Sequence, residues 1–289
     1  MKIAEYYIKV LRKKIISDQL YLKNKFVKKL GYVPNFKHPN SFNEKVNARI
    51  LFDKSSQYTK LADKWFVRQS VAKKIGEQYL VPIIGCYDKI SDIEFKQLPD
   101  KFVIKCTHDS GSAIICTNKS SFNFEKVKQK INNHLRKNMH VITREWHYKN
   151  IPPRIIIEKY IELFFDKNNV TITTCRVHCF EGKAQYIEID ITNEKKIEFT
   201  NIYDINWVLQ PFNVDNQENV SICLPSFIHE VIELSEKLCL TYGYSRIDFL
   251  LSQNQIFFSE ITLTPNAGRM VIIPLEWDFK LGQLWKVFP

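Results

Sequence analysis

The chain has 289 residues, of which 45% are hydrophobic, and a formal net charge of +11 at pH 7. This length and composition suit a folded protein with a substantial core and exclude an intrinsically disordered chain. The uninterrupted apolar runs are far shorter than a bilayer span, so we expect no transmembrane segment. The amino terminus lacks a long apolar stretch before a small-residue cleavage site, and we therefore expect a cytoplasmic protein.

Positive charge is concentrated in the first half of the chain. Residues 1–150 contain 30 Lys and Arg against 13 Asp and Glu, a net charge of +17, whereas residues 151–289 contain 12 against 18, a net charge of −6. This asymmetry favours polyanionic ligands such as nucleotide phosphates or acidic sugars. Nucleic acid is the disfavoured partner, because the lysines are spread along helical patterns and no RNA-binding or helix-turn-helix motif is found.

The seven cysteines are odd in number and lack paired metal-ligand spacing. This pattern predicts reduced, mostly buried thiols and no disulfide framework. Cys175 and Cys179 share one face of a predicted strand, but His178 lies on the other face, so the sequence does not support a zinc site there.

The first hundred residues are predicted to be mainly helical and basic. Apolar residues recur at near-helical spacing over residues 3–30, which predicts a basic helix that either packs on the protein or lies on an anionic membrane surface. Ser41 and Glu44 have capping-box spacing and predict a helix through about Leu51. A further helix is predicted over residues 59–76, with Gly76 as its left-handed cap.

From residue 101 onward, apolar alternation predicts strands. They cover residues 102–106, 113–116, 154–161, 171–180 and 183–191. A polar loop over 107–112 joins the first two, and Glu181-Gly182 is a hairpin signal between the last two. Helices are predicted over residues 124–137 and from a cap at Ser226 to about Leu240.

Near the carboxyl end, two strand-like runs joined by a polar stretch predict a hairpin that carries two carboxylates. Alternation of side chains along a strand sends one set of residues into a core, namely Ile247, Phe249, Leu251, Phe257, Ile261 and Leu263. The opposite face then holds Arg246, Asp248, Glu260 and Thr262. If the register pairs Asp248 with Glu260, two carboxylates meet beside a guanidinium, and such oxygen ligands suit Mg²⁺ held against phosphates. The alternative is an ordinary amphipathic hairpin with a solvated polar face.

Two further segments suggest nucleotide contacts. Lys105 ends the strand over 102–106 and precedes a small polar loop, an arrangement that brings an ammonium group and backbone N–H groups toward phosphate. Residues 158–161 would let backbone groups meet an adenine edge at the end of a strand. Neither a GxxxxGK[ST] nor a GxGxxG pattern is present, so an exposed lysine and a plain strand terminus remain the alternatives.

Together, and in this order, these elements resemble the ATP-grasp superfamily, and most closely its polysaccharide-biosynthesis branch, the TupA-like proteins of teichuronopeptide biosynthesis. The resemblance covers nearly the whole chain and depends on the collinear order of short motifs. These are Lys29-Leu30-Gly31-Tyr32, Ser41-Phe42-Asn43-Glu44-Lys45, Tyr58 to Lys64, Val67-Arg68, Phe102 to Cys106 with His108, Ser110 and Gly111, Arg144-Glu145-Trp146, Pro153 to Ile156, Glu158-Lys159-Tyr160, Cys179-Phe180 with Gly182-Lys183, Arg246 to Phe249, and Glu260-Ile261-Thr262 with Thr264-Pro265 and Gly268.

The resemblance implies an α+β, ATP-grasp fold in which two α+β lobes hold ATP between them. A mainly helical basic region over residues 1–100 would come first. A lid subdomain over 101–160 and a metal-binding subdomain over 161–289 would follow.

The same resemblance implies ATP and Mg²⁺ as cofactors and gives roles to individual residues. Nucleotide contacts would come from Lys105, Ser110, Gly111, Glu158, Lys159, Tyr160 and Ile161. Mg²⁺ would be held by Asp248, Glu260 and Thr262. Lys105, Arg246, Arg176 and His108 would act in catalysis, and Arg269 would bind the acceptor carboxylate.

Three residues depart from the family pattern. Thr262 stands where many ATP-grasp enzymes have a metal-binding asparagine, although nearer relatives tend to carry threonine. Thr174 replaces an acidic residue expected near the ribose, and Asp109 replaces a loop glycine. Thr174 and Asp109 motivate the hypothesis of a non-catalytic nucleotide-binding partner.

The resemblance implies an ATP-dependent carboxylate–amine ligase that acts through an acyl phosphate in the biosynthesis of a cell-surface polysaccharide such as capsule, O-antigen or a teichuronopeptide-like polymer. Its substrates would be an acidic sugar, free or nucleotide-linked, and an amine or amino acid. The alternative enzyme is a glycosyltransferase or sugar kinase. Glu188 and Asp190 resemble an acidic metal pair of the glycosyltransferase type, and the favoured interpretation of these two residues is a polar strand face. A peripheral contact with the inner membrane face or with glycan-assembly proteins is a further expectation.

Overall fold

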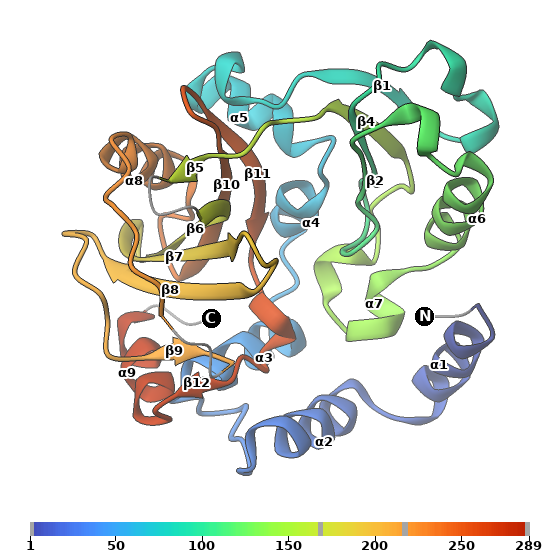
Figure 1. Ribbon diagram of the computed structural model, residues 1–289. Coiled ribbons are helices and arrows are strands. Elements are labelled where there is room, and N and C mark those ends of the chain that lie inside the picture. The colour runs from blue at the N-terminus through green and yellow to red at the C-terminus, as the bar shows by residue number, and fades with distance from the viewer. Residues whose placement is uncertain (1–2, 167–169, 216–218, 287–289) are drawn as a thin grey trace. The chain divides into compact units, whose positions relative to one another are not determined.

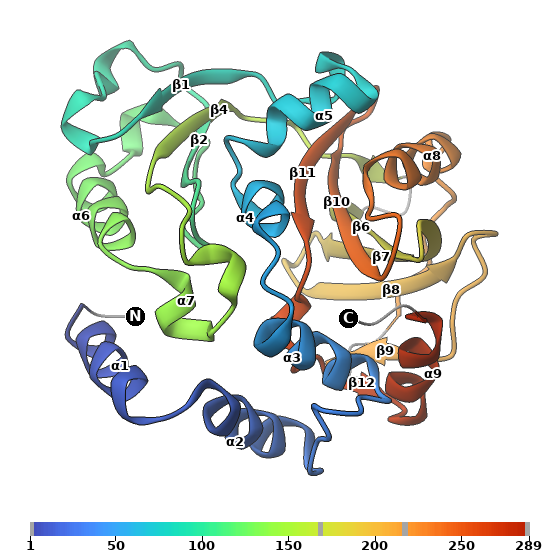
Figure 2. The same cartoon turned by 180° about the vertical axis from the view of Figure 1, so that it is seen from behind.

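The computed structural model describes residues 3–166, 170–215 and 219–286 (Figures 1 and 2). The chain divides into two compact units that are each built from separate segments. Unit 1 comprises Met1–Tyr21, Lys54–Gln69 and Val81–Ile161, and unit 2 comprises Leu22–Asp53, Ser70–Leu80 and Glu162–Pro289. Both units combine helices with antiparallel sheets, as the α+β prediction requires.

Unit 1 contains a four-stranded antiparallel sheet in the order β1-β4-β2-β3. Its strands are β1 (Ile83–Tyr87), β4 (Ile155–Lys159), β2 (Phe102–Cys106) and β3 (Ile114–Cys116). The strands predicted near residues 102–106, 113–116 and 154–161 are therefore confirmed.

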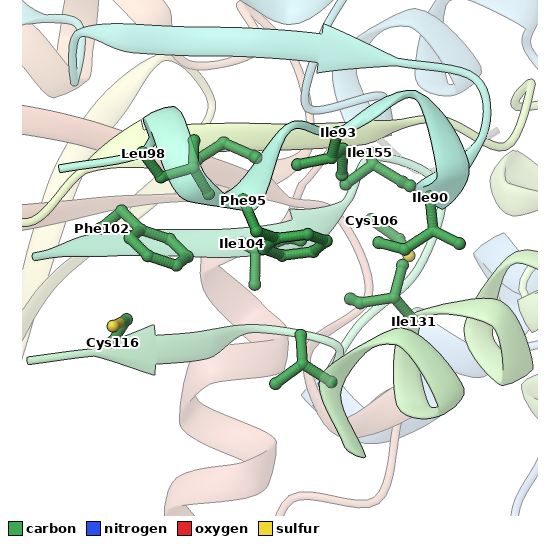
Figure 3. Packing of buried hydrophobic residues seen from close by; sticks show 12 residues of the cluster. Ile90, Ile93, Phe95, Leu98, Phe102, Ile104, Cys106, Cys116, Ile131 and Ile155 are labelled. Carbon is green, nitrogen blue, oxygen red and sulfur yellow. The ribbon is translucent and has the colours of Figure 1, made fainter. Parts of the chain in front are cut away.

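One face of this sheet is covered by α6 (Phe124–Leu135) and by the short 3-10 helices η2 (Ile90–Asp92) and η3 (Phe95–Gln97). Figure 3 shows Phe102 and Ile104 of β2 facing Phe95 and, from α6, Ile131. Phe102, Ile104 and Ile131 are fully buried. Alternate residues of β2 thus form the core of unit 1, which leaves Lys105 on the opposite face.

Two predicted helices are interrupted in the structure. The helix predicted over residues 3–30 is two helices, α1 (Ile3–Ile15) and α2 (Asp18–Leu30), because Ser17 Oγ accepts the Leu20 N–H at 3.3 Å and starts a new helix. Unit 1 contains α1, α7 (Met139–Thr143) and the 3-10 helices η4 (Lys119–Ser121) and η5 (Trp146–Tyr148), whereas α2 from Leu22 onward belongs to unit 2.

The helix predicted over residues 59–76 is also interrupted. It forms α4 (Ser56–Ala62) and α5 (Val67–Ile75). The break occurs at Asp63, which is buried and accepts hydrogen bonds from the Trp65 and Phe66 N–H groups at 2.9 and 3.3 Å. A carboxylate that binds the free N–H groups of a new helical turn ends one helix and caps the next. Gly76 follows α5 with a φ of 107° and a ψ of 154°, so it has the positive φ of the predicted cap but not the left-handed helical conformation.

Unit 2 contains a six-stranded sheet in the order β11-β10-β6-β7-β8, with β5 also paired to β6. The strands are β5 (Phe165–Asp166), β6 (Val170–Phe180), β7 (Lys183–Asn193), β8 (Glu198–Asp204), β10 (Tyr244–Leu251) and β11 (Ile256–Thr262). A smaller sheet pairs β12 (Ile272–Ile273) with β9 (Asn213–Val214). The predicted hairpin at Glu181-Gly182 is confirmed, with both residues at positive φ.

The two faces of the six-stranded sheet differ in polarity. Odd-numbered residues such as Val177, Ile189 and Ile247 are fully buried on one face. That face packs against α8 (Ile228–Leu238), and Cys239 at the end of this helix interacts with Cys179. Even-numbered residues of the same strands occupy the other face and include the charged Arg176, Glu188 and Asp248.

The predicted cap at Ser226 is wrong. α8 begins after Phe227 without a side-chain cap, and the Pro225 carbonyl accepts the Ile228 N–H at 3.1 Å. A backbone turn therefore satisfies the first free donor of the helix, and no hydroxyl is required.

The capping box of α3 (Phe42–Phe52) is confirmed, since Ser41 Oγ accepts the Glu44 N–H and the Glu44 side chain accepts the Ser41 N–H. In unit 2, α3 packs against α9 (Glu276–Leu284) and against η6 (Pro265–Ala267), as Figure 2 shows for α3 and α9. The 3-10 helix η1 (Glu77–Tyr79) contacts β11.

Each cysteine is a free thiol, and all but Cys86 and Cys223 are buried. Within the described part of the chain, none of the helices has the length and apolar content that crossing a bilayer requires.

Candidate functional site

The register of the β10–β11 hairpin places Asp248 directly opposite Glu260 and Arg246 directly opposite Thr262. The predicted pairing of the two carboxylates is therefore confirmed. A bulge follows at once, between Asp248 and Phe249, so this pair stands at the last regular position before the register shifts.

Four neighbouring strands extend this pairing into a row of charges. Glu260 on β11 faces Asp248 on β10, Asp248 faces Arg176 on β6, and Arg176 faces Glu188 on β7. We call Glu260, Asp248, Arg176 and Glu188 the charge ladder. Their apolar odd-numbered neighbours enter the core, so all four side chains lie on the polar face.

Arg246 holds Asp248 through two hydrogen bonds, from Nε to Oδ1 at 2.8 Å and from Nη2 to Oδ2 at 2.7 Å. The Thr262 hydroxyl lies 3.5 Å from both Asp248 Oδ2 and Glu260 Oε1. Burial raises the pKa of Asp248, Arg246 opposes this shift, and Glu260 adds to it. Two carboxylates this close thus repel each other in spite of the guanidinium.

The donor set formed by Asp248, Glu260 and Thr262 fits Mg²⁺. A divalent cation between the two carboxylates would relieve their repulsion, and Mg²⁺ is typically bound by one or two carboxylates together with water and substrate phosphates. In the described part of the chain there is no group of three or more His, Cys, Asp or Glu side chains suited to a metal ion. The remaining ligands would therefore be phosphate oxygens and water.

Arg176 is bound by acidic residues on both sides. Its guanidinium pairs with Glu188 and Asp190, and its Nε lies 4.0 Å from Asp248 Oδ2. Burial opposes the charge of Arg176, but these carboxylates raise its pKa above the usual value. Arg176 therefore stays positive beside the carboxylate pair.

Glu188 connects the charge ladder to a second row of residues. His178 Nε2 lies 2.9 Å from Glu188 Oε2, and the buried Tyr244 hydroxyl lies 3.0 Å from His178 Nδ1. Burial disfavours ionisation of Glu188, yet His178 and the two arginines hold its pKa well below the usual range. The Glu188 carboxylate is thus ionised and fixed in place by its partners.

A cavity of about 320 Å³ opens on the polar face of this sheet. Two arginines and four carboxylates are among its lining residues, which are Thr173, Arg176, Glu188, Asp190, Ile191, Glu198, Phe199, Thr200, Val214, Asp215, Arg246, Asn266 and Met270. Because Arg246 both lines the cavity and binds Asp248, the cavity adjoins the carboxylate pair. It is large enough for a small polar substrate.

The turn after β11 is strained and is held by α3. Asn266, Ala267 and Gly268 have φ values of 48°, 48° and 67°, three successive residues in the left-handed region. Asn47 Nδ2 donates to the Gly268 carbonyl at 2.8 Å, and a Cβ at Gly268 would lie 2.1 Å from that same nitrogen. Asn43 binds both backbone groups of Met270, at 2.8 and 2.9 Å.

Sequence reasoning missed the roles of Asn43 and Asn47. The only signal was two asparagines at i and i+4 of the predicted helix, a spacing that places them on one face. The partners of that face cannot be read from the helix itself. His178 and Thr200, which contact Glu188 and Asp190, were missed for the same reason.

In unit 1, Lys105 and Glu158 come together across the paired strands β2 and β4. Lys105 Nζ lies 2.7 Å from Glu158 Oε2, and Arg68 Nη1 lies 3.5 Å from Glu158 Oε1. The Glu158 side chain is 7% exposed, so one buried carboxylate holds two cations. The structure thus supplies two positive groups where the sequence predicted only Lys105.

Asp109, one of the residues that depart from the family pattern, anchors the polar loop over residues 107–112. Asp109 is buried, and its carboxylate binds Ser112 Oγ and His134 Nδ1. Lys64 Nζ donates to the Asp109 carbonyl at 2.6 Å. Ser110 and Gly111, at the tip of the loop, are exposed, and Gly111 has a φ of 82°.

His108 lies apart from this exposed tip. It is 3% exposed, and its Nε2 is 3.3 Å from the His134 carbonyl. Burial lowers the pKa of His108, so the ring is neutral near pH 7. Its catalytic role remains a prediction.

The remaining predicted residues are dispersed. Lys159 is exposed and its N–H donates to the Pro82 carbonyl at 2.9 Å, while Tyr160 and Ile161 are half-buried beyond the end of β4. Arg269 donates to the Ala267 carbonyl at 3.1 Å and is not among the residues lining the cavity described above. Thr174 faces Asp190 across β6 and β7.

Comparison with known proteins gives one extended sequence match. Residues 44–286 match the TupA-like ATP-grasp family. No curated protein sequence matches the chain.

Several solved structures are similar at low identity. An L-amino acid ligase from Bacillus licheniformis has a TM-score of 0.45 and 10% identity, over 78% of this chain and 49% of that one. A D-alanine–D-alanine ligase from Bacillus anthracis has a TM-score of 0.43 and 15% identity, over 78% and 65%. The ATP-grasp ligase PsnB, complexed with a phosphomimetic variant of its minimal precursor, Mg and ADP, has a TM-score of 0.42 and 7% identity, over 73% and 53%. The chain therefore spans about half the length of several of these structures.

The family match covers most of the chain. The protein belongs to the TupA-like ATP-grasp family.

Proposed function

We propose that the protein is an ATP- and Mg²⁺-dependent carboxylate–amine ligase in the biosynthesis of a cell-surface polysaccharide. It joins an amino acid or another amine to an acidic sugar, which is free, nucleotide-linked or lipid-linked. The observation that carries the proposal is the cross-strand pair of Asp248 and Glu260, with the Thr262 hydroxyl 3.5 Å from each carboxylate. This donor set is typical of a phosphate-bound Mg²⁺.

The proposed chemistry follows from the weakness of a carboxylate as an electrophile. Transfer of the γ-phosphoryl group of ATP to the acceptor carboxylate gives an acyl phosphate and ADP, and attack by the amine then releases phosphate and forms the amide. When bound, Mg²⁺ would offset negative charge on the phosphate oxygens.

The residues of the chain stabilise charge and position groups in this scheme. Arg246 is held at fixed geometry by Asp248, and Arg176 by Glu188 and Asp190, so both guanidinium groups are oriented before substrate arrives. Lys105 is oriented in the same way by Glu158.

The cavity of unit 2 supports the choice of substrates. Its volume of about 320 Å³ suits a small polar molecule, and its arginines and carboxylates can bind both an acidic and an amino group. The adjoining carboxylate pair would place the phosphoryl group at its edge.

The test is product analysis with ATP, Mg²⁺, uronic acids or their nucleotide-linked forms, and a panel of amino acids. We expect ADP, phosphate and a product whose mass equals acid plus amine minus water. Glu260→Gln is expected to abolish this product, and Glu276→Gln, which changes an exposed glutamate of α9, is the matched control.

Other outcomes identify other functions. Transfer of a sugar without ATP consumption would indicate a glycosyltransferase, but Glu188 and Asp190, its proposed acidic pair, are bound to Arg176. Phosphorylated sugar without amide would indicate a kinase. Stabilisation by ATP without ADP formation for any acceptor would indicate a non-catalytic nucleotide-binding protein.

A further inference from the structure

Helix α1 has two distinct apolar faces. The first packs within unit 1 against α7, and Figure 1 shows the two helices side by side. On this face Tyr6 is buried and its hydroxyl accepts the Asn138 N–H at 3.1 Å, while Lys13 contacts His140. Burial lowers the pKa of Lys13 to about 8. This face holds the helix on the unit.

The second apolar face is exposed. Tyr7, Ile8, Leu11 and Ile15 have exposed fractions of 59%, 50%, 60% and 85%. At about 100° per residue these side chains occupy one continuous arc of roughly 100° around the helix. We call these four residues the apolar stripe. Exposed apolar side chains that gather on one face indicate an interaction surface.

Basic residues border the apolar stripe on both sides. On the same helical projection, Lys14 lies about 20° beyond Tyr7, and Arg12 lies about 40° beyond Ile8. Both side chains are exposed. Long cationic side chains at the edges of an apolar face keep their charges at the level of lipid headgroups while the apolar residues enter the acyl region.

We propose that α1 docks the protein on the surface of an anionic lipid bilayer, with the apolar stripe in the interface and Arg12 and Lys14 against the lipid phosphates. Charge complementarity selects this occupant, because a convex apolar ridge flanked by the cations of Arg12 and Lys14 matches a negatively charged surface with an apolar interior. The helix has 13 residues and is about 20 Å long, so it lies in the interface and does not cross the membrane.

The proposal is independent of the nucleotide chemistry, because α1 contributes no residue to the charge ladder or to the cavity of unit 2. A protein that binds vesicles without ligase activity would support the docking surface alone. Ligase activity without vesicle binding would support the proposed function alone.

The test is sedimentation of the full chain with phosphatidylcholine vesicles that contain 30% phosphatidylglycerol, compared with pure phosphatidylcholine vesicles, at low and high salt. We expect binding to the anionic vesicles that weakens with salt. The double variant Arg12→Gln and Lys14→Gln is expected to bind about thirtyfold more weakly, because each cation near such a surface contributes about a fivefold factor. The double variant Leu11→Gln and Ile15→Gln is expected to lose more than about tenfold.

Matched controls change exposed apolar residues outside α1. Val33→Gln and Tyr242→Gln alter side chains with exposed fractions of 68% and 69% and are expected to bind vesicles like the unchanged protein. Circular dichroism checks that all variants fold.

Two results would overturn the proposal. One is the absence of binding to anionic vesicles by the unchanged protein. The other is a dimer, measured by light scattering, that the Leu11→Gln and Ile15→Gln variant converts to a monomer while vesicle binding stays the same, because the apolar stripe would then bind a second copy of the chain.

Discussion

Replacing Asp248 by Asn tests the carboxylate pair at the centre of the proposed function. The substitution keeps the shape of the side chain and one carbonyl acceptor for Arg246, but it removes the charge opposite Glu260 and a predicted metal ligand. Two separable effects follow, one on stability and one on the response to Mg²⁺ and ATP.

The effect on stability follows from the burial of Arg246, which is 9% exposed and donates two hydrogen bonds to Asp248. Removing one partner of a buried ion pair typically destabilises a protein by 3–5 kcal/mol. The retained amide oxygen and the nearby Glu188 offset part of that loss, so we expect a decrease of about 2–3 kcal/mol in the free energy of unfolding. For a protein of 289 residues, that decrease corresponds to a fall of about 3–5 °C in Tm.

The effect on function is larger. ATP with Mg²⁺ at a hundredfold excess over its Kd would stabilise the unchanged protein by about 2.7 kcal/mol, a rise in Tm of similar size. We expect the Asp248→Asn variant to lose this rise and to form ADP at least about a hundred times more slowly. Thermal unfolding with and without Mg²⁺ and ATP, together with an ADP assay, measures both quantities.

A control separates loss of a carboxylate in general from loss of this one. Asp88→Asn changes a carboxylate that is 81% exposed and pairs only weakly with Arg154, at 3.4 Å. It should leave both Tm and the ATP response unchanged. If Asp248→Asn instead retains the full Mg²⁺-dependent rise in Tm and near-normal ADP formation, the carboxylate pair does not hold the metal, and the reasoning fails.

Three other predictions test neighbouring features. Because the folded-state pKa of Glu188 lies below its ordinary value, its contribution to stability is present at neutral pH and is lost as the pH falls below about 4–5. Urea unfolding at several pH values should show that the free energy of unfolding falls more steeply with acid for the unchanged protein than for Glu188→Gln. Equal dependence on pH in the two proteins would contradict this prediction. Gly268→Ala should destabilise the protein by more than about 1 kcal/mol, because Gly268 has a positive φ and the added Cβ would collide with Asn47. An unchanged Tm would show that the turn after β11 accommodates the side chain. Lys105→Met should weaken ATP binding at least about tenfold and lower Tm. The double variant that adds Glu158→Gln should recover Tm but not ATP binding. If calorimetry shows that the double variant binds ATP with normal affinity, Lys105 does not contact the nucleotide.

Much of the fold could be predicted where the signal is local. The strand over 102–106 alternates buried and half-buried residues, and Ser41 and Glu44 satisfy each other within one helical turn. The pairing of Asp248 with Glu260 could also be predicted, because the short connection between β10 and β11 restricts the register.

Features that depend on segments far apart in the sequence could not be predicted. β6 and β10 pair across some seventy residues, so nothing in the local sequence places Arg176 opposite Asp248. For the same reason the sequence could not show what Glu188 and Asp190 bind, since their partner Arg176 lies on another strand. Asp63 broke a predicted helix because a buried carboxylate that caps two N–H groups outweighs the helical propensity of its neighbours.

The contact between α3 and the turn after β11 has a consequence for how the protein is made. Asn43 and Met270 are 227 positions apart, and a ribosome adds about 5–20 residues per second. Asn43 is therefore added to the chain about ten to fifty seconds before its partner is synthesised. During that interval the side chains of α3 that are buried in the folded protein, among them Phe42, Asn43 and Asn47, lack their final partners, so we expect chaperones to bind the nascent chain at this helix.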